Sequence, residues 1–255
     1  MAASAGARPK SGSAPAASPR TKAGAAPAAK ALPGVRQRAA QAARENILRA
    51  ATKVFAKHGF AGGRVERISK AAKSHDRMIY YYFGSKVGLF IAVLEALYER
   101  FNQAEAMLVL DTAQPAAALQ GVVQFMWGYY QKRPEFITLL NSENLHRGTH
   151  IAKSLRARGY SSPAIAVLGE VLASGAAQGV FRADVAARDV YLMIASMGYF
   201  YLSNRYTLSA FLGEELQAPQ ALAHWEGFVI DAVMRTVAAR PRSTLRETSG
   251  RRPLV

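Results

Sequence analysis

Two short helical segments joined by a tight corner, within residues 64–86, constrain this chain more than any other feature. Apolar residues recur at helical spacing in both: Val65, Ile68, Ala72, Ile79 and Phe83. Helices of two turns are not stable alone in water, so both must pack on another element. The segment from about Gln41 to Lys57 offers an apolar face: Ile47, Leu48, Ala51, Val54 and Phe55. The three predicted helices form a helix-turn-helix unit whose last helix can enter the DNA major groove.

The positive charge is concentrated near this unit and at the two ends of the chain. The net charge is +16 over 255 residues. Residues 1–40 have seven basic and no acidic residues, and residues 41–90 have ten and three. Residues 91–239 have eleven and thirteen, and residues 240–255 have five and one. A basic first third beside a nearly neutral remainder is typical of a protein that binds nucleic acid through that third.

Several classes of protein are disfavoured by what the sequence lacks. It contains no cysteine, so no disulfide, cysteine-type zinc site or thiol nucleophile is expected. It has no apolar run of roughly 18 residues or more and no secretory signal, so we expect no membrane association and a cytoplasmic location. The abundance of Ala and Arg fits a GC-rich bacterial genome. No GxSxG, P-loop, GxGxxG or HExxH motif occurs, so we expect no catalytic residue, no enzyme activity and no cofactor.

Beyond the helix-turn-helix unit, the chain continues with helical periodicity. Expected helix starts are Ser85, Pro115, Pro134, Pro163, Asp184 and Pro219. No stretch alternates with period two, so we predict an all-α fold of about nine helices. The predicted organisation is a disordered basic tail (1–38), a DNA-binding domain (39–85), a regulatory domain (86–240) and a second disordered basic tail (241–255). The first tail either contacts DNA phosphates or the minor groove, or only aids solubility.

Within residues 41–90 the chain has REN-IL-AA--VFA--GF, then V--I, then Ala72, then IY-YF-SK--L. These residues at this spacing resemble the tetracycline-repressor (TetR) family of bacterial transcription regulators. Further on, RPEFITLLNSENLHRG is similar to one subgroup of regulatory domains in that family. The resemblance implies a three-helix DNA-binding head and an all-α regulatory domain that dimerises and binds a small-molecule inducer.

The expected recognition helix indicates which residues contact DNA. Arg77 lies in its first turn, where side chains reach base edges, and Arg paired with guanine is the commonest specific contact. The resemblance implies that Tyr81, with Tyr80 or Tyr82, bonds phosphate, and Lys86 suits a phosphate at the start of the next helix. The predicted DNA-contacting residues are Arg64, Lys73, Ser74, His75, Arg77, Met78, Tyr80, Tyr81 and Lys86.

The corner before the recognition helix departs from the family pattern. Many members have Gly, Val and Ser where this chain has Lys73, Ser74 and His75. The corner must therefore form without its usual glycine, and Lys73 adds a positive charge there. The N-cap of the recognition helix is expected at His75 or Asp76, and an Asp side chain suits that position well.

The resemblance also assigns roles in the regulatory half. Helices over 185–206 and 220–239 would pair with those of a second copy as a four-helix dimer interface, unless they are monomer core. Two recognition helices about 34–36 Å apart would then require a near-palindromic operator. Candidate pocket residues, each of which could equally be core, are Phe125, Met126, Trp127, Tyr129, Tyr130, Phe136, Asn144 and Phe200. For Glu143, His146 and His150, spaced three and four apart, a hydrogen-bonded or solvated role is favoured over metal binding.

Two functions follow from these features. The leading hypothesis is a dimeric transcription repressor that a small-molecule inducer releases from its operator. The alternative, suggested by the basic tails, is a sequence-tolerant architectural DNA-binding protein. The inducer, the operator and the target genes are not encoded in any motif of the sequence.

Overall fold

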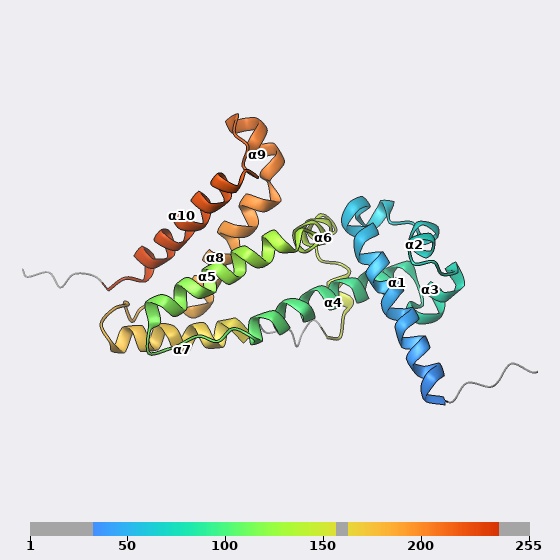
Figure 1. Ribbon diagram of the computed structural model, residues 1–255, viewed down its shortest axis with the longest axis horizontal. Coiled ribbons are helices and arrows are strands. Elements are labelled where there is room, and N and C mark those ends of the chain that lie inside the picture. The colour runs from blue at the N-terminus through green and yellow to red at the C-terminus, as the bar shows by residue number, and fades with distance from the viewer. Residues whose placement is uncertain (1–32, 157–162, 240–255) are drawn as a thin grey trace, which may run out of the picture. The chain divides into compact units, whose positions relative to one another are not determined.

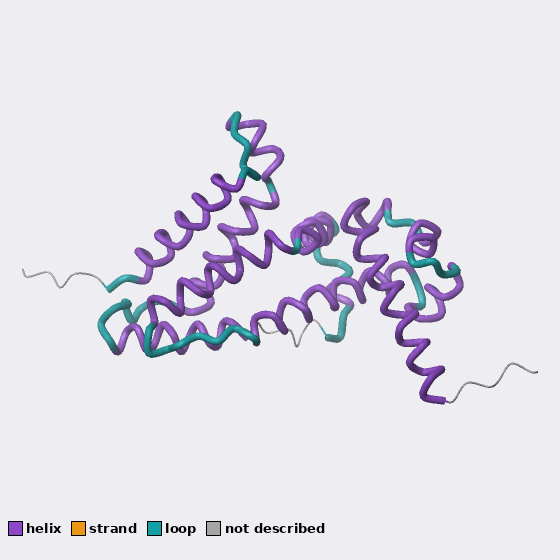
Figure 2. The backbone as a smooth tube through the Cα atoms, viewed as in Figure 1, coloured by secondary structure: helices purple, strands orange, loops and turns teal. Residues whose placement is uncertain are grey.

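A computed structural model describes residues 33–156 and 163–239, and these residues are almost entirely helical (Figures 1 and 2). The elements are α1 (Pro33–Gly62), α2 (Val65–Ala71), α3 (Asp76–Phe83), α4 (Lys86–Ala106), α5 (Pro115–Lys132), α6 (Pro134–Leu145), a 3-10 turn η1 (Ile151–Lys153), α7 (Pro163–Ala177), α8 (Ala187–Ser203), α9 (Arg205–Leu212) and α10 (Pro219–Val237). Within these ranges there is no strand, only one isolated bridge between Phe181 and Ala238. The predicted all-α fold is confirmed.

Most predicted helix starts are also those observed. Pro115, Pro134, Pro163 and Pro219 are each the first residue of a helix, where a missing N–H costs nothing. Ser85 caps α4, because its hydroxyl oxygen accepts a hydrogen bond from the Gly88 N–H at 2.9 Å. Local sequence signals therefore determine where these helices begin.

The structure corrects two predicted boundaries. Helix α1 begins at Pro33, so the predicted disorder of residues 1–38 is wrong for residues 33–38. Pro33 and Gly34 lie in the first turn of this helix, and no Gly or Pro follows them within residues 35–38 to oppose it. Residues 1–32 and 240–255 lie outside the described residues. Asp184 does not cap α8, because its carboxylate accepts hydrogen bonds from Arg182 and the N-cap is Ala186.

The predicted helix over 185–206 is in fact two helices. Helix α8 ends at Ser203, and α9 starts at Arg205 after the non-helical Asn204. The Asn204 side-chain amide donates a hydrogen bond to the Phe200 carbonyl at 2.9 Å, which occupies an acceptor at the end of α8. This break raises the number of α-helices in the described residues to ten, one more than the nine expected.

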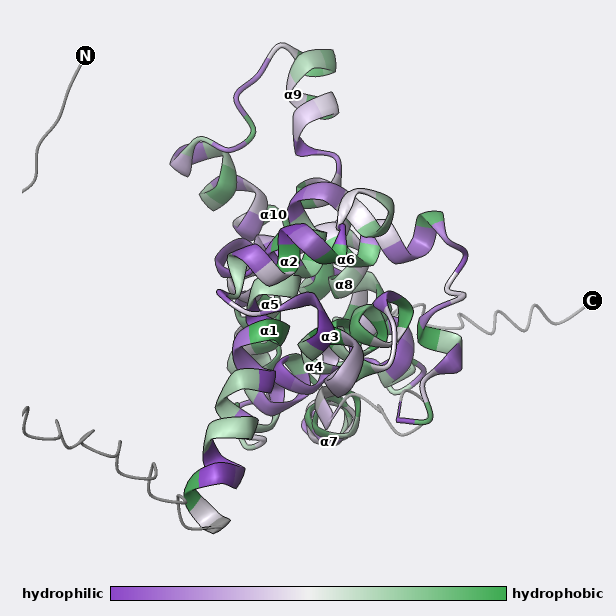
Figure 3. Ribbon diagram, turned by 90° about the vertical axis from the view of Figure 1, so that its right-hand side faces the viewer, coloured by the Kyte–Doolittle hydropathy of each residue, from purple (hydrophilic) through white to green (hydrophobic). Residues whose placement is uncertain are grey.

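The chain divides after Ala39 into two units, and in the first of them the described residues are the exposed start of α1. In the second unit, the predicted apolar faces of the first three helices are buried: Ile47, Phe55, Ile68 and Ile79 are fully inaccessible to solvent. Figure 3 shows hydrophilic and hydrophobic residues on the same helix ribbons, as expected for amphipathic helices.

The downstream helices pack around α5. Helix α5 contacts α7, α8 and α10, and α7 also contacts α4 and α8. Buried side chains from these helices form one continuous core with those of the first three helices. None of the described helices is long and apolar enough to cross a membrane.

We predict that Gly88→Ala destabilises the protein by about 1–3 kcal/mol. A Cβ atom at Gly88 would lie 2.1 Å from the Phe83 carbonyl oxygen, a backbone atom that cannot move aside as a side chain would. Gly128→Ala is the matched control, because nothing lies within 4 Å of its Cβ position and it should stabilise α5 by about 0.5–1 kcal/mol. Urea denaturation of both variants measures the difference, and equal stabilities would contradict this packing.

Candidate nucleic-acid interface and ligand pocket

One face of α3 is anchored in the core and the other is open to solvent. Ile79 is fully buried, and Met78 is half-buried against the core. Arg77, Tyr80 and Tyr81 are exposed, with 77% of the Tyr81 side chain accessible. A short helix that exposes an arginine and two tyrosines in this way suits insertion into a DNA groove. The structure therefore brings Arg77, Tyr80 and Tyr81 together on one exposed face, whereas Met78 is only partly available.

The corner between α2 and α3 forms without glycine. Lys73 has a φ of 49°, in the left-handed region that usually requires Gly. The Ser74 N–H donates to the Ser69 carbonyl at 2.9 Å, so the bonding that ends α2 is still made. Lys73 and His75 are exposed and Ser74 is half-buried. The chain thus tolerates a strained lysine at the position nearest the start of α3.

Of the two candidates for the N-cap of α3, His75 occupies the position. Its backbone is extended, with φ −101° and ψ 147°, and its side chain makes no capping bond. Asp76 is the first helical residue, and its carboxylate accepts a hydrogen bond from the Ser69 hydroxyl. The prediction that Asp76 caps α3 is therefore wrong; Asp76 instead ties α3 to α2, and its charge suits the first turn of a helix.

Lys86 is held by the protein rather than directed freely to solvent. Its Nζ donates to the Ala61 carbonyl at 3.2 Å and lies 4.7 Å from the centre of the Phe60 ring. Partial burial, with the nearby charge of Arg64, lowers the pKa of Lys86 below its ordinary value. Arg64 itself is exposed at the N-cap of α2.

Arg44 is a candidate DNA-contacting residue that sequence reasoning missed. Its guanidinium lies 5.0 Å from the centre of the Phe83 ring, at the end of α3. In sequence Arg44 is one of several basic residues on α1, and only the packing of α1 against α3 distinguishes it. The aromatic ring orients the guanidinium, and such a cation–π interaction contributes about 0.5–1 kcal/mol at exposed sites.

The end of α1 is joined to the downstream helices through Phe60. Gly59 has the non-helical angles φ 65° and ψ 179°, so α1 is kinked there and Phe60 lies beyond the kink. The Phe60 ring centre lies 5.0 Å from that of Phe90 on α4 and 4.4 Å from that of His150. The Phe60 N–H also donates to the Ser142 hydroxyl on α6 at 3.4 Å.

A buried carboxylate organises the chain beside Phe60. Glu143 accepts hydrogen bonds from His150 Nδ1 at 2.8 Å, from the His150 N–H at 2.8 Å and from the Ile151 N–H at 2.9 Å. His146 Nδ1 instead bonds the Ser142 carbonyl at 2.7 Å. The favoured hydrogen-bonded role for these residues is thus confirmed. Among the described residues, no group of three or more ligand-type side chains could hold a metal ion.

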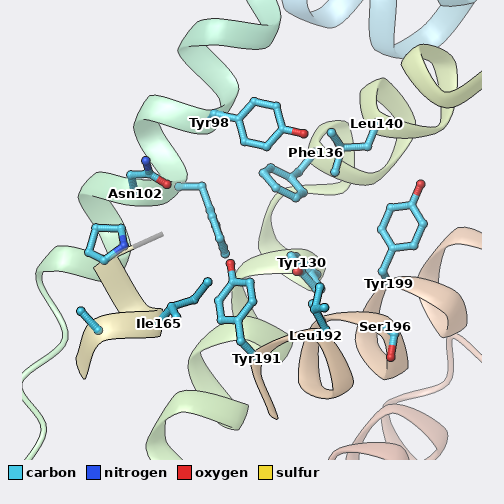
Figure 4. A pocket seen from close by; sticks show the side chains of 14 residues that line it. Tyr98, Asn102, Tyr130, Phe136, Leu140, Ile165, Tyr191, Leu192, Ser196 and Tyr199 are labelled. Atoms are coloured by element: carbon cyan, nitrogen blue, oxygen red, sulfur yellow. The ribbon is translucent and has the colours of Figure 1, made fainter. Parts of the chain in front are cut away.

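A cavity of about 840 Å³ lies among α4, α5, α6, α7 and α8. It is mainly aromatic and apolar. Its described lining is Tyr98, Phe101, Asn102, Tyr130, Phe136, Leu140, Pro163, Ile165, Ala166, Tyr191, Leu192, Ala195, Ser196 and Tyr199 (Figure 4). Its volume and lining are those of a small-molecule site.

Of the predicted pocket residues, Tyr130 and Phe136 line this cavity. Met126 and Trp127 point into the core instead, with Trp127 packed edge-on against Tyr201. Phe125 and Tyr129 are partly buried on Phe101, outside the lining. Asn144 is exposed at the end of α6, and Phe200 is 58% exposed on α8.

The missed lining residues come mostly from α4, to which the sequence assigned no pocket residue, and from α8, which it assigned to the dimer interface. A signal was present, because Tyr98 and Asn102 on α4, and Tyr191, Ala195 and Tyr199 on α8, repeat every four residues. Burial raises the pKa of Tyr98 and, more strongly, that of Tyr130 above the ordinary tyrosine value. Both hydroxyls therefore stay protonated at neutral pH.

The three-helix unit with an exposed α3, joined to a helical body with an aromatic cavity, defines a helix-turn-helix transcription regulator. Residues 47–93 match the family described as "Bacterial regulatory proteins, tetR family", and residues 115–233 match "Tetracyclin repressor-like, C-terminal domain". The chain belongs to the TetR family. Regulators of this family bind DNA, dimerise and respond to effectors, and they are not enzymes.

Two curated relatives are similar over most of their length. The HTH-type transcriptional repressor NicS of Pseudomonas putida is 54% identical over 202 residues, which cover 79% of this chain and 95% of that protein. The HTH-type transcriptional repressor SCO4008 of Streptomyces coelicolor is 30% identical over 166 residues, or 63% of this chain and 78% of that protein.

Solved structures share the fold at lower identity. The putative transcriptional regulator SCO4942 of Streptomyces coelicolor has a TM-score of 0.57 at 23% identity, over 77% of this chain and 99% of that one. A TetR family regulator from Marinobacter aquaeolei has a TM-score of 0.55 at 20% identity, over 80% and 100%. At these identities the likeness concerns the fold alone.

We predict that Lys73→Gly stabilises the protein by about 0.5–1 kcal/mol, because Gly removes the left-handed strain while adding some unfolded-state entropy. Lys70→Gly is the control: it removes the same charge from within α2 and should destabilise by about 1 kcal/mol. Thermal and urea unfolding measure both. A loss of stability in Lys73→Gly would contradict a strained corner.

Proposed function

We propose that this chain is a transcriptional repressor that binds a near-palindromic operator as a homodimer and is released by a small-molecule effector. The observation that carries the proposal is the exposed Arg77–Tyr81 face of α3, in the same chain as an aromatic cavity of about 840 Å³. The similarity to two proteins named as repressors supports repression rather than activation. Binding to the bacterial chromosome implies action in the cytoplasm.

We assign the DNA contacts from the exposure of each side chain. Arg77 reads base edges, and Tyr80 and Tyr81 donate hydroxyls to phosphate. The remaining backbone contacts come from the basic and polar residues around α3: Arg44, Arg64, Lys73, Ser74 and His75. Met78 and Lys86 have lesser roles, because Met78 packs on the core and the Lys86 ammonium bonds Ala61. The N-terminal basic tail adds non-specific attraction.

The dimer is proposed to form through α8 and α10. Both helices expose large apolar side chains, with Leu192, Phe200 and Phe228 each at least 50% accessible. Trp225 on α10 stacks on Phe228 at 5.2 Å between ring centres, which extends the surface. Burying such side chains against a second copy would contribute about 25 cal/mol per Å² of apolar surface. The DNA-binding units of two copies could then occupy two half-sites.

Helix α6 is the proposed route from the cavity to the DNA-binding unit. Phe136 and Leu140 on α6 line the cavity, while Ser142 on the next turn bonds the backbone of Phe60. An effector that favours a different position of α6 would therefore change how the end of α1 is held. To do so, it must bind the DNA-free arrangement more tightly than the DNA-bound one.

Selection of bound fragments from a random DNA pool, followed by footprinting, tests the function. Protection of a discrete palindrome supports the repressor. Uniform coating of any sequence would instead support an architectural DNA-binding protein, the alternative that the basic tails suggest.

We predict that Arg77→Ala costs about 1–3 kcal/mol on the selected operator and leaves binding to random DNA almost unchanged, because it removes a base contact. Tyr81→Phe, its control, removes a phosphate contact and should weaken both DNAs by a similar factor. Fluorescence anisotropy titrations on the two DNAs at several salt concentrations measure this. Equal loss on both DNAs in Arg77→Ala would exclude base reading by this residue.

We predict that Phe228→Lys dissociates the dimer, because it places a charge in the apolar α8–α10 surface and burying an unpaired charge is costly. Val109→Lys is the matched control, since Val109 is 98% exposed in the segment after α4 and should leave the dimer intact. Analytical ultracentrifugation gives the masses. A dimer of unchanged stability in Phe228→Lys would place the interface elsewhere.

A further inference from the structure

Asn102 is the distinctive polar group of the aromatic cavity. It lies on α4 beside Phe101 and lines the cavity, where it is neither fully buried nor exposed. No hydrogen bond joins its side-chain amide to any other residue of the described chain. Figure 4 shows Tyr98 and Asn102 projecting from α4 on one side of the cavity, with Ser196 and Tyr199 projecting from α8 on the other.

Three other polar groups of the lining already have protein partners. The Tyr191 hydroxyl donates to buried Glu105 at 3.1 Å. The Tyr199 hydroxyl donates to the Asn141 side-chain oxygen, and the Ser196 hydroxyl donates to the Met193 carbonyl at 2.9 Å. Their protons are therefore committed to the protein, whereas the Asn102 amide keeps both a donor and an acceptor for whatever fills the cavity.

The geometry of an amide restricts what can satisfy it. Its N–H and C=O groups lie side by side in one plane, so the best partner presents an acceptor and a donor side by side in the same plane. Asn pairs with the edge of adenine in this way. A ligand without such an edge would leave the amide desolvated and unpaired, which costs binding free energy.

The walls of the cavity favour a planar partner. Tyr130 stacks on Phe136, with 5.5 Å between ring centres and 20° between ring planes. Aromatic rings at such distances prefer offset-stacked or edge-on neighbours. A flat ring compound can therefore pack against these walls while its edge meets Asn102, and a cavity of about 840 Å³ holds at least two fused rings.

We propose that the cavity takes a planar heteroaromatic compound whose ring edge carries a hydrogen-bond donor beside an acceptor, as in a lactam, and that Asn102 pairs with this edge. This inference rests on the proposed function, in which the same cavity holds the effector. Asn102 thereby determines specificity, and the aromatic walls supply affinity that depends little on the identity of the ring.

Two matched probes test the pairing: 2-quinolone, which has adjacent N–H and C=O groups, and 1-methyl-2-quinolone, in which the donor is blocked. The full-length protein should bind 2-quinolone about tenfold more tightly, since one good paired edge is worth about that factor. Isothermal titration calorimetry on both probes gives the ratio. In Asn102→Leu the ratio should fall to about one, because leucine offers neither the acceptor that the N–H of 2-quinolone needs nor the donor that its C=O needs.

Gln103→Leu is the matched control, because Gln103 is exposed on α4 outside the lining and the ratio should be unchanged. Equal binding of the two probes to the unaltered protein, absence of binding by both, or a tenfold ratio that survives in Asn102→Leu would each overturn the proposal. Binding of the selected operator is measured on the same samples. Retained operator binding would then show that the ligand inference alone has failed, whereas its loss in the unaltered protein would count against the repressor itself.

Discussion

The arrangement of this molecule depends on the packing around Phe90, at the start of α4. Its ring is fully buried, with centres 5.0 Å from those of Phe55, Phe60 and His150. These three residues belong to the core of α1, the end of α1 beyond its kink and the segment after α6. One aromatic side chain therefore contacts both the DNA-binding unit and the regulatory helices. Loss of that packing would leave α3 without a defined position relative to the cavity.

The second constraint is that helix α6 contacts both the cavity and the end of α1. Its twelve residues line the aromatic cavity at one end and hold the end of α1 at the other, through Ser142 and the Glu143–His150 pair. Because the carboxylate of Glu143 is buried and accepts three hydrogen bonds, the segment around His150 is closely fixed to α6. A displacement of α6 would therefore be transmitted to Phe60 and Phe90. Such coupling requires a rigid connection, and buried hydrogen bonds to a charge provide one.

The helices and buried faces of the DNA-binding unit were largely predictable, because their signals are local. The spacing of Ile47, Phe55, Ile68 and Ile79 determined which faces are buried, and Ser85 marked the start of α4. The corner was anticipated as unusual, but its left-handed Lys73 was visible only in the backbone. The cavity was predicted less well. Trp127 and Met126 were plausible lining residues, yet they face the core, because the rotation of α5 depends on the helices packed around it.

The sequence alone therefore determined the helical fold, the last helix of the helix-turn-helix unit and membership of a family of regulators. The first two follow from periodicity and capping, which act over a few residues, and the third follows from the resemblance of residues 41–90 to the family. Only the tertiary structure decided which face of α4 and α8 lines a cavity, that Lys86 is bound to Ala61, and that the Asn102 amide bonds no other group within residues 33–156 and 163–239. The physical reason is that these properties arise where residues distant in sequence meet. Periodicity shows that a helix has a buried face, but it does not show what lies against it.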